Sequence, residues 1–182
     1  MKKISLFIAV MTFACLTFAQ TSAPAAAPPK PTSVTEGKTL SELLNWMLGE
    51  WNGEGVAREQ EFVGSMKADS VLDDQAVMIM RESSNKPGGP AGGLKEIMVI
   101  GYEASAKLIV MTLHTSNNST GIYTGEMKQT ELVFNVANAP QGFVNRRTFK
   151  LLPDGGLSFI IERGDPGKAV GKLVEINFKK KS

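Results

Sequence analysis

The sequence predicts an all-β protein: an antiparallel up-and-down β-barrel of about ten strands, preceded by one short N-terminal helix. After Gly49, short runs rich in β-branched and aromatic residues recur, with turn-forming residues between them. Several runs alternate apolar and polar side chains, which is typical of antiparallel strands with one buried face. No segment after Gly49 has the helical apolar period of about 3.6 residues, so parallel strand–helix–strand units are not expected.

The start of the chain has the features of a secretory signal peptide, residues 1–19. Lys2 and Lys3 precede an apolar run, and the small residues Thr17 and Ala19 fit a cleavage site after Ala19. The run is short for a bilayer whose apolar core is about 30 Å thick. We therefore expect a periplasmic or secreted protein of bacterial type, with no stable membrane insertion after cleavage. An uncleaved membrane anchor is the alternative.

Cys15, the only cysteine, lies inside this segment, so the cleaved protein would contain no disulfide. Lipidation would need a cysteine at the cleavage point; Ala14–Cys15 fits in part, but Thr12 stands where leucine is usual. Two of the 20 basic residues precede the cleavage site, and the other 18 equal the 18 acidic residues in number. A nearly neutral chain does not favour nucleic acid as a partner.

The cleaved chain divides into a linker and one domain. Residues 20–36 are rich in Ala, Pro and Thr and favour extended backbone, as in a disordered linker. Residues 37–182 have the size of a single domain whose hydrophobic core is stable without disulfides. The sequence leaves the oligomeric state open.

The domain begins with the predicted helix. Thr39 and Glu42 form a Thr-x-x-Glu capping box, and Gly49 ends the helix. Apolar residues recur after the cap at helical spacing: Leu40, Leu43, Leu44, Met47 and Leu48. We expect this helix to plug or flank one end of the barrel.

The predicted strands follow one another as a meander. They cover about residues 50–58, 65–73, 76–83, 94–102, 107–115, 121–127, 131–137, 143–151, 157–163 and 172–180. Asp73–Asp74 and Gly155–Gly156 are among the turn signals between them. A sandwich is the alternative, but closure into a barrel removes the edges that a long meander would expose. The Gly- and Pro-rich residues 85–93 predict a mobile connection, either a plain hairpin loop or a lid.

The junction of the helix and the first strand resembles the opening of lipocalin-like (calycin) barrels. It reads Leu48-Gly49-Glu50-Trp51-Asn52-Gly53-Glu54-Gly55. The resemblance implies that Trp51 lies across the closed end of the barrel, just after Gly49. It also implies that Gly53 and Gly55 allow a sharp bend and a close approach of the backbone.

Over about residues 43–180 the chain resembles the bacterial lipocalin-like family known as domain of unknown function 1579. Besides the opening, the shared pieces are Gly101-Tyr102-Glu103, Ser119-Thr120-Gly121, Arg147-Thr148 and Val174-Glu175-Ile176-Asn177-Phe178. Where the family has aromatic and acidic residues at the end of the central strand, this chain has His114 and Ser116.

More distantly, the opening resembles that of nitrobindin-like and fatty-acid-binding-protein-like barrels with about ten strands. Nitrobindin-like barrels hold haem through a histidine near the C-terminus. Because this chain has no histidine after His114, we expect no haem, and we assign no other cofactor.

Residue patterns for catalysis and metal binding are scarce. With one histidine and one cysteine in the chain, a zinc site is not expected. The acidic pairs do not match the spacing of a calcium loop, and no Gly-x-Ser-x-Gly nucleophile motif occurs. We therefore assign no catalytic residue and no metal ligand.

Arg147 is the sharpest candidate for ligand binding. It shares the apolar face of its strand with Phe149. A buried guanidinium needs an anionic partner. Glu175, Glu162 or Glu96 would give a structural ion pair, whereas the absence of such a partner would favour a ligand that carries a carboxylate.

We expect an exported binding module for a small hydrophobic or amphipathic molecule, with Arg147, His114, Tyr102 and Phe149 as ligand-binding residues. Whether His114 points inward is open, because both faces of its strand are apolar. One alternative is an enzyme on the same scaffold, of the isomerase or decarboxylase type, with His114 and a carboxylate as acid and base. Another is a solid-core structural or interaction protein, which a large exposed apolar patch would favour.

Overall fold

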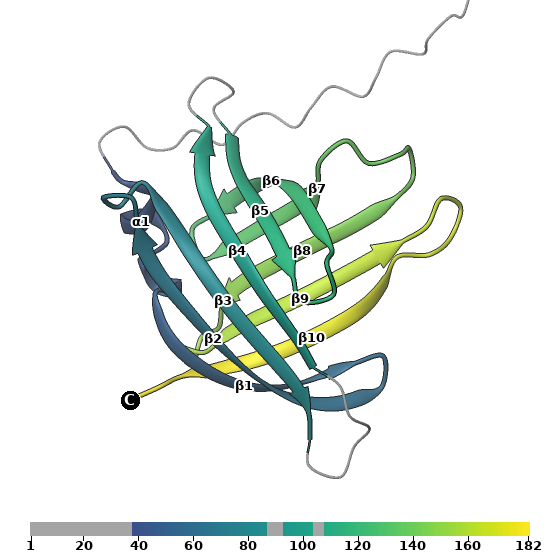
Figure 1. Cartoon of the computed structure of the whole chain (residues 1–182), viewed down its shortest axis with the longest axis horizontal. Helices are drawn as coiled ribbons and strands as arrows, with labels where there is room; N and C mark the ends of the chain where they lie inside the picture. Colours follow the sequence, from purple (N-terminus) through teal and green to yellow (C-terminus); the bar gives the residue numbers. More distant parts are fainter. Residues whose placement is uncertain (1–37, 87–92, 104–107) are drawn as a thin grey trace, which may run out of the picture. The chain divides into compact units, whose positions relative to one another are not determined.

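A closed antiparallel barrel of ten strands forms the domain (Figure 1). The computed structural model describes residues 38–86, 93–103 and 108–182. Each strand pairs with its neighbours in the chain, and the last strand returns to pair with the first. The predicted fold class is thereby confirmed. The predicted signal peptide, the predicted linker and most of the Gly- and Pro-rich connection lie outside the described residues.

The strand boundaries follow the predicted ones closely. The strands are β1 (Gly49–Ala57), β2 (Gln60–Val71), β3 (Ala76–Asn85), β4 (Gly93–Glu103), β5 (Leu108–Thr115), β6 (Thr120–Lys128), β7 (Glu131–Val136), β8 (Val144–Leu151), β9 (Leu157–Gly164) and β10 (Gly171–Lys180). The main difference is β2, which begins at Gln60 rather than near Ser65. Arg58 and Glu59 form a two-residue turn with φ of 47° and 71°. Positive φ at both positions is what a type I′ hairpin turn requires, but Arg-Glu lacks the usual Asn-Gly signal.

The helix is shorter than its apolar pattern suggests. It comprises α1 (Leu40–Leu43) and a 3₁₀ turn, η1 (Asn45–Met47). The capping box is present, because the Glu42 N–H donates to Thr39 Oγ1 and the Thr39 N–H donates to Glu42 Oε2. Ser41 N–H donates to the carbonyl of Asp74, which holds α1 beside the β2–β3 turn (Figure 1).

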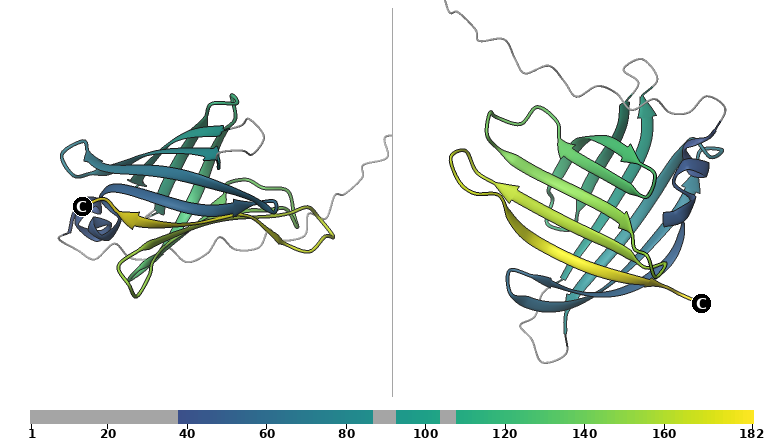
Figure 2. Two further views of the ribbon diagram at one scale, coloured as in Figure 1. Left: turned by 90° about the horizontal axis from the view of Figure 1, so that it is seen from below. Right: turned by 180° about the vertical axis from the view of Figure 1, so that it is seen from behind.

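The two ends of the barrel differ in how they are filled. The helix end holds α1 and the β2–β3 turn, while the other end, which we call the mouth, holds the β1–β2 and β5–β6 turns (Figure 2). Trp51, Leu44 and Met47 are fully buried near the helix end, and the Trp51 indole N–H donates to the Met47 carbonyl at 3.0 Å. The remaining interior side chains are mostly apolar, so the barrel has a packed core below its mouth.

Closure of the barrel depends on glycines in β1. A Cβ at Gly53 would lie 2.6 Å from the Asn177 carbonyl oxygen, and a Cβ at Gly55 only 2.1 Å from that of Glu175. Real Cβ atoms do not approach that closely, so side chains at these two positions would push β10 away from β1.

In the part of the chain that the structure describes, no helix has both the length and the apolar character needed to cross a bilayer.

Candidate ligand-binding site

Three buried charged residues meet inside the barrel, close to its mouth. Arg81 on β3 and Glu96 on β4 are register partners on adjacent strands, and both point inward. Arg147 reaches the same place from β8, across the barrel. The inward phase of each strand is otherwise apolar, as Ile79, Met98 and Phe149 illustrate. Strand alternation therefore places all three charges in the lumen.

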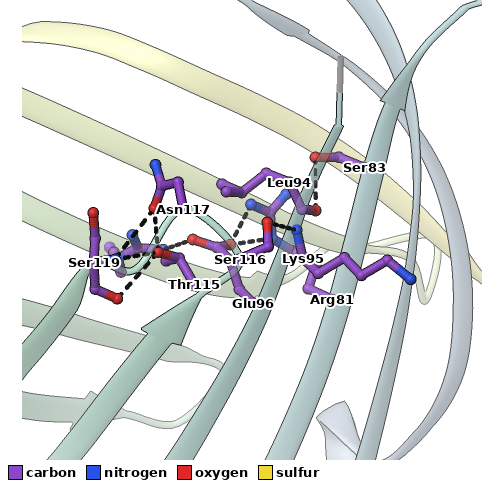
Figure 3. A network of polar contacts seen from close by, with 10 residues as sticks. Arg81, Ser83, Leu94, Lys95, Glu96, Thr115, Ser116, Asn117 and Ser119 are labelled. Atoms are coloured by element: carbon purple, nitrogen blue, oxygen red, sulfur yellow. Dashed lines mark hydrogen bonds and ion pairs between the residues drawn. The ribbon is translucent and has the colours of Figure 1, made fainter. Parts of the chain in front are cut away.

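Glu96 is shared by the two arginines. Arg81 donates to Glu96 Oε2 through both Nε, at 2.6 Å, and Nη2 (Figure 3). Arg147 Nη1 donates to Glu96 Oε1 at 3.1 Å. Side-chain exposure is 2% for Arg81, 0% for Glu96 and 8% for Arg147. One carboxylate thus accepts three charge-assisted hydrogen bonds in a site that water scarcely reaches.

The cluster carries a net charge of +1. Among the described residues, Arg81, Glu96 and Arg147 are the buried charged ones, so two guanidinium groups face one carboxylate. Burial lowers the pKa of Arg81 below its ordinary value; Glu96 opposes this shift, and the positive charge of Arg147 adds to it. The downward direction means that Glu96 does not fully replace the solvation that Arg81 has in water.

Two nitrogen atoms of the cluster lack hydrogen-bond partners. Arg81 Nη1 and Arg147 Nε are buried and make no hydrogen bond. Aromatic rings replace part of the missing contacts, since the Arg81 guanidinium lies 4.9 Å from the centre of the Phe159 ring and that of Arg147 lies 5.5 Å from the Tyr123 ring. These rings attract positive charge without accepting a conventional hydrogen bond, so the site keeps unused donor capacity.

A cavity of about 510 Å³ opens at the mouth above this cluster. Arg81 forms its floor, because the other lining residues of β3 lie nearer the mouth end of that strand. Its wall is partly apolar and partly polar. The lining residues are Ala57, Gln60, Phe62, Arg81, Ser83, Ser84, Asn85, Gly93, Leu94, Ile161 and Val174. The volume lies within the range of about 300–1,000 Å³ that small-molecule pockets span.

A larger hollow of about 1,200 Å³ lies mainly over outward-facing residues of β1, β2, β3, β4 and β10. Its charged lining residues, such as Glu82, Lys95 and Lys179, are exposed to solvent. Solvated side chains of this kind gain little from a partner. We therefore regard the smaller cavity, with its buried charge, as the candidate site.

The structure brings together only some of the predicted ligand-binding residues. Arg147 and Phe149 lie in the lumen, where Phe149 packs on Phe159 with ring centres 4.7 Å apart. His114 is exposed on the outer face of β5, and it lines neither of the two cavities. Tyr102 lies near the helix end of β4, several residues beyond Glu96. His114 and a carboxylate therefore do not converge on the cavity, as the enzyme alternative would require.

Arg81 is the buried, cavity-lining charged residue that sequence reasoning missed. It follows Val77 and Ile79 in the same phase of β3, the same signal that identified Arg147. Met78 and Met80 make the opposite face of β3 apolar as well, so the sequence does not show which face of this strand points into the barrel. Of the three acidic partners considered for Arg147, the structure selects Glu96, whereas Glu162 pairs with Arg146.

Among the described residues, no cluster of three or more His, Cys, Asp or Glu side chains could hold a metal ion.

Comparison with known proteins identifies the fold but no family. No protein-family model matches the sequence, and no curated protein is significantly similar to it. The structure is similar to the crystal structure of Rv2717c from M. tuberculosis, with a TM-score of 0.58 and 12% sequence identity. The match covers 78% of this chain and 97% of that one. At this identity the likeness shows the barrel fold alone.

Proposed function

We propose that the protein is a binding module that holds one small amphipathic molecule in the cavity at the barrel mouth. The observation that carries this proposal is a cavity of about 510 Å³ whose wall is apolar at Phe62, Leu94 and Ile161 and whose floor is the buried Arg81. Ligand pockets combine these two features, because apolar walls supply affinity and a few polar groups fix orientation.

The rest of the interior supports a carrier role over a catalytic one. Below the charged cluster the lumen is packed with apolar and aromatic side chains. The described residues that line the cavity offer hydrogen bonds and charge but include no histidine, cysteine or paired carboxylates. Such a lining can hold and orient a molecule, but it provides no proton donor and acceptor pair poised for acid–base chemistry.

Binding of the uncharged fluorescent probe N-phenyl-1-naphthylamine tests the proposal. We expect saturable fluorescence enhancement with about one site per chain. Ala57→Phe, which fills the cavity from β1, should weaken binding at least tenfold. Val56→Phe is the matched control, because Val56 is the adjacent residue, lies on the outer face and lines neither cavity. Equal binding of the probe by the two variants, or no saturable binding by the wild type, would contradict the proposal that the mouth cavity is the binding site.

A second candidate function is self-association through the outer face of the sheet. Met80 on β3 and Ile97 on β4 are direct register partners, and they are 39% and 46% exposed. A two-fold axis would place this patch on the same patch of a second copy. Sedimentation velocity at increasing protein concentration tests it: the wild type should dimerise and Ile97→Lys should not, whereas a wild-type monomer at all concentrations rejects it.

We also propose that the protein is exported and that it is related to the bacterial lipocalin-like family known as domain of unknown function 1579. Export to the periplasm or beyond is supported by the features of residues 1–19, and the relation to the domain of unknown function 1579 by the motifs of the barrel strands.

A further inference from the structure

We propose that the Arg81–Glu96–Arg147 cluster binds a small monovalent inorganic anion of the size of chloride at the floor of the mouth cavity. This ion site goes beyond the proposed function, because it neither requires nor specifies the amphipathic molecule. It follows from the charge, the hydrogen bonds and the position of the three side chains.

Charge balance is the first argument. A buried charge without a partner loses its solvation and gains little in return. Arg81 and Arg147 share the carboxylate of Glu96, and the part of the chain that the structure describes contains no other buried charge. One positive charge therefore remains, and one negative charge nearby would neutralise the cluster. The same ion would screen the repulsion by which Arg147 lowers the pKa of Arg81.

Unused donor capacity is the second argument. Arg81 donates through Nε and Nη2 to Glu96 Oε2, whereas its Nη1 is buried and makes no hydrogen bond. Arg147 Nε is the other buried nitrogen of the cluster without a partner. A spherical anion accepts hydrogen bonds from any direction, and a bond from a guanidinium to an anion is a strong, charge-assisted one.

The position of Arg81 favours a single-atom anion over a bulky headgroup. Arg81 lines the cavity, but its Nη1 is buried. A halide ion needs little more room than a water molecule, whose share of liquid volume is about 30 Å³, so a small shift of neighbouring side chains admits it. The apolar wall at Phe62, Leu94 and Ile161 then stays available to another molecule.

Chloride-linked stability tests the ion site without altering the protein. The Tm is measured while chloride replaces fluoride at constant ionic strength. In general, strongly hydrated anions such as fluoride stabilise proteins more, but they cost more to bury. We expect the opposite order here, because chloride and bromide should raise the Tm with saturation. With a dissociation constant of about 5 mM, about 500 mM chloride should raise it by about 5–10 °C.

Substitutions separate the charge from the donor. Arg81→Met removes both and leaves Glu96 paired one-to-one with Arg147, so the chloride response should vanish. Arg147→Met keeps the Arg81 donor but leaves a neutral pair, and the affinity for chloride should fall at least about tenfold. Arg146→Met is the matched control, because Arg146 is the neighbouring arginine on β8 and pairs with Glu162 outside the lumen. Its chloride response should equal that of the wild type.

Glu96→Gln should change the response in the opposite direction. It raises the charge of the cluster from +1 to +2, so chloride should bind more tightly and should restore part of the stability that the substitution removes. A cluster that binds no ion would lose the same stability at every chloride concentration.

A crystal structure in bromide locates the ion, through an anomalous peak at hydrogen-bond distance from Arg81 Nη1. Equal Tm values of the wild type in chloride and fluoride would show that the ion site is wrong, and so would a chloride response that persists in Arg81→Met. If the variants do not fold, the order of the halides on the wild type and the bromide peak decide. The fluorescent probe tests the proposed function separately, so either proposal can fail while the other stands.

Discussion

At the scale of single residues, the buried Arg81–Glu96–Arg147 cluster is the most consequential feature of the barrel. Strand alternation was enough to predict that Arg147 points inward. The partner could not be chosen from the sequence, because Glu96 is 51 residues away in the chain and meets Arg147 across the lumen, not on a neighbouring strand. Pairing between strands is local, but contacts across a barrel depend on how it closes.

Replacing Glu96 should be among the most damaging single changes. Glu96→Gln leaves two buried guanidinium groups without a counterion, and we expect the free energy of unfolding to fall by about 3–5 kcal/mol. Urea denaturation measures the loss. Glu82→Gln is the control, since Glu82 on β3 pairs with Lys95 in solvent and should cost about 1 kcal/mol or less. Similar losses in the two variants would show that the cluster is not a buried ion network.

The two tryptophans provide another comparison. Trp51→Phe leaves the Met47 carbonyl without its indole donor, and it should cost about 1–3 kcal/mol. The Trp46 indole nitrogen is buried without a partner, so Trp46→Phe removes an unsatisfied donor and should cost less than Trp51→Phe. Thermal or urea unfolding of both variants measures this difference, and a more damaging Trp46→Phe would contradict the assigned role of Trp51.

At the scale of elements, turn residues made the strands predictable. Asp73 and Asp74 have φ of 50° and 66°, and Gly155 has φ of 82°, so at these three positions the left-handed backbone coincides with residues that tolerate it. Leu72, in the same turn as the two aspartates, has φ of 54° without that advantage. The β1–β2 turn escaped prediction because Arg58 and Glu59 adopt the same region without that chemical signal. The sequence predicts a longer helix than the structure contains. The reason is that a 3₁₀ turn buries Leu44 and Met47 on the barrel and keeps nearly the same spacing of apolar residues as an α-helix.

The contact between β1 and β10 can be tested with one added methyl group. Gly55→Ala should lower the free energy of unfolding by about 1–3 kcal/mol, since its Cβ would overlap the Glu175 carbonyl. Gly101→Ala on β4 should be neutral or slightly stabilising, because no atom lies within 4 Å of its added Cβ. Denaturant midpoints measure both effects. An unaffected Gly55→Ala variant would mean that β1 and β10 do not approach so closely.

At the scale of the whole molecule, closure was predictable and the cavity was not. A meander of alternating strands has exposed edges that closure removes, and this argument required no knowledge of individual contacts. The position of an open volume depends instead on which side chains fill each level of the lumen. The cavity exists because small side chains such as Ala57 and Ser83 line the mouth, while Trp51 and Phe178 fill the helix end.

Export is a further prediction at this scale. In a bacterial expression host, the exported protein should begin at Gln20 and carry no lipid, as intact-mass measurement of the secreted fraction would show. Ala19→Arg should block cleavage, because the −1 position requires a small residue. A mass that includes Met1, or a lipid adduct that Cys15→Ser abolishes, would favour the membrane anchor or the lipoprotein.

Native mass spectrometry of the protein from its own cellular compartment addresses the central claim most directly. The wild-type protein should carry one non-covalently bound small molecule that is released on denaturation, and Ala57→Phe should carry none. Val56→Phe should behave like the wild type. A wild-type protein that has the mass of the bare chain, and that still shows no saturable binding of N-phenyl-1-naphthylamine, would contradict a ligand-binding barrel.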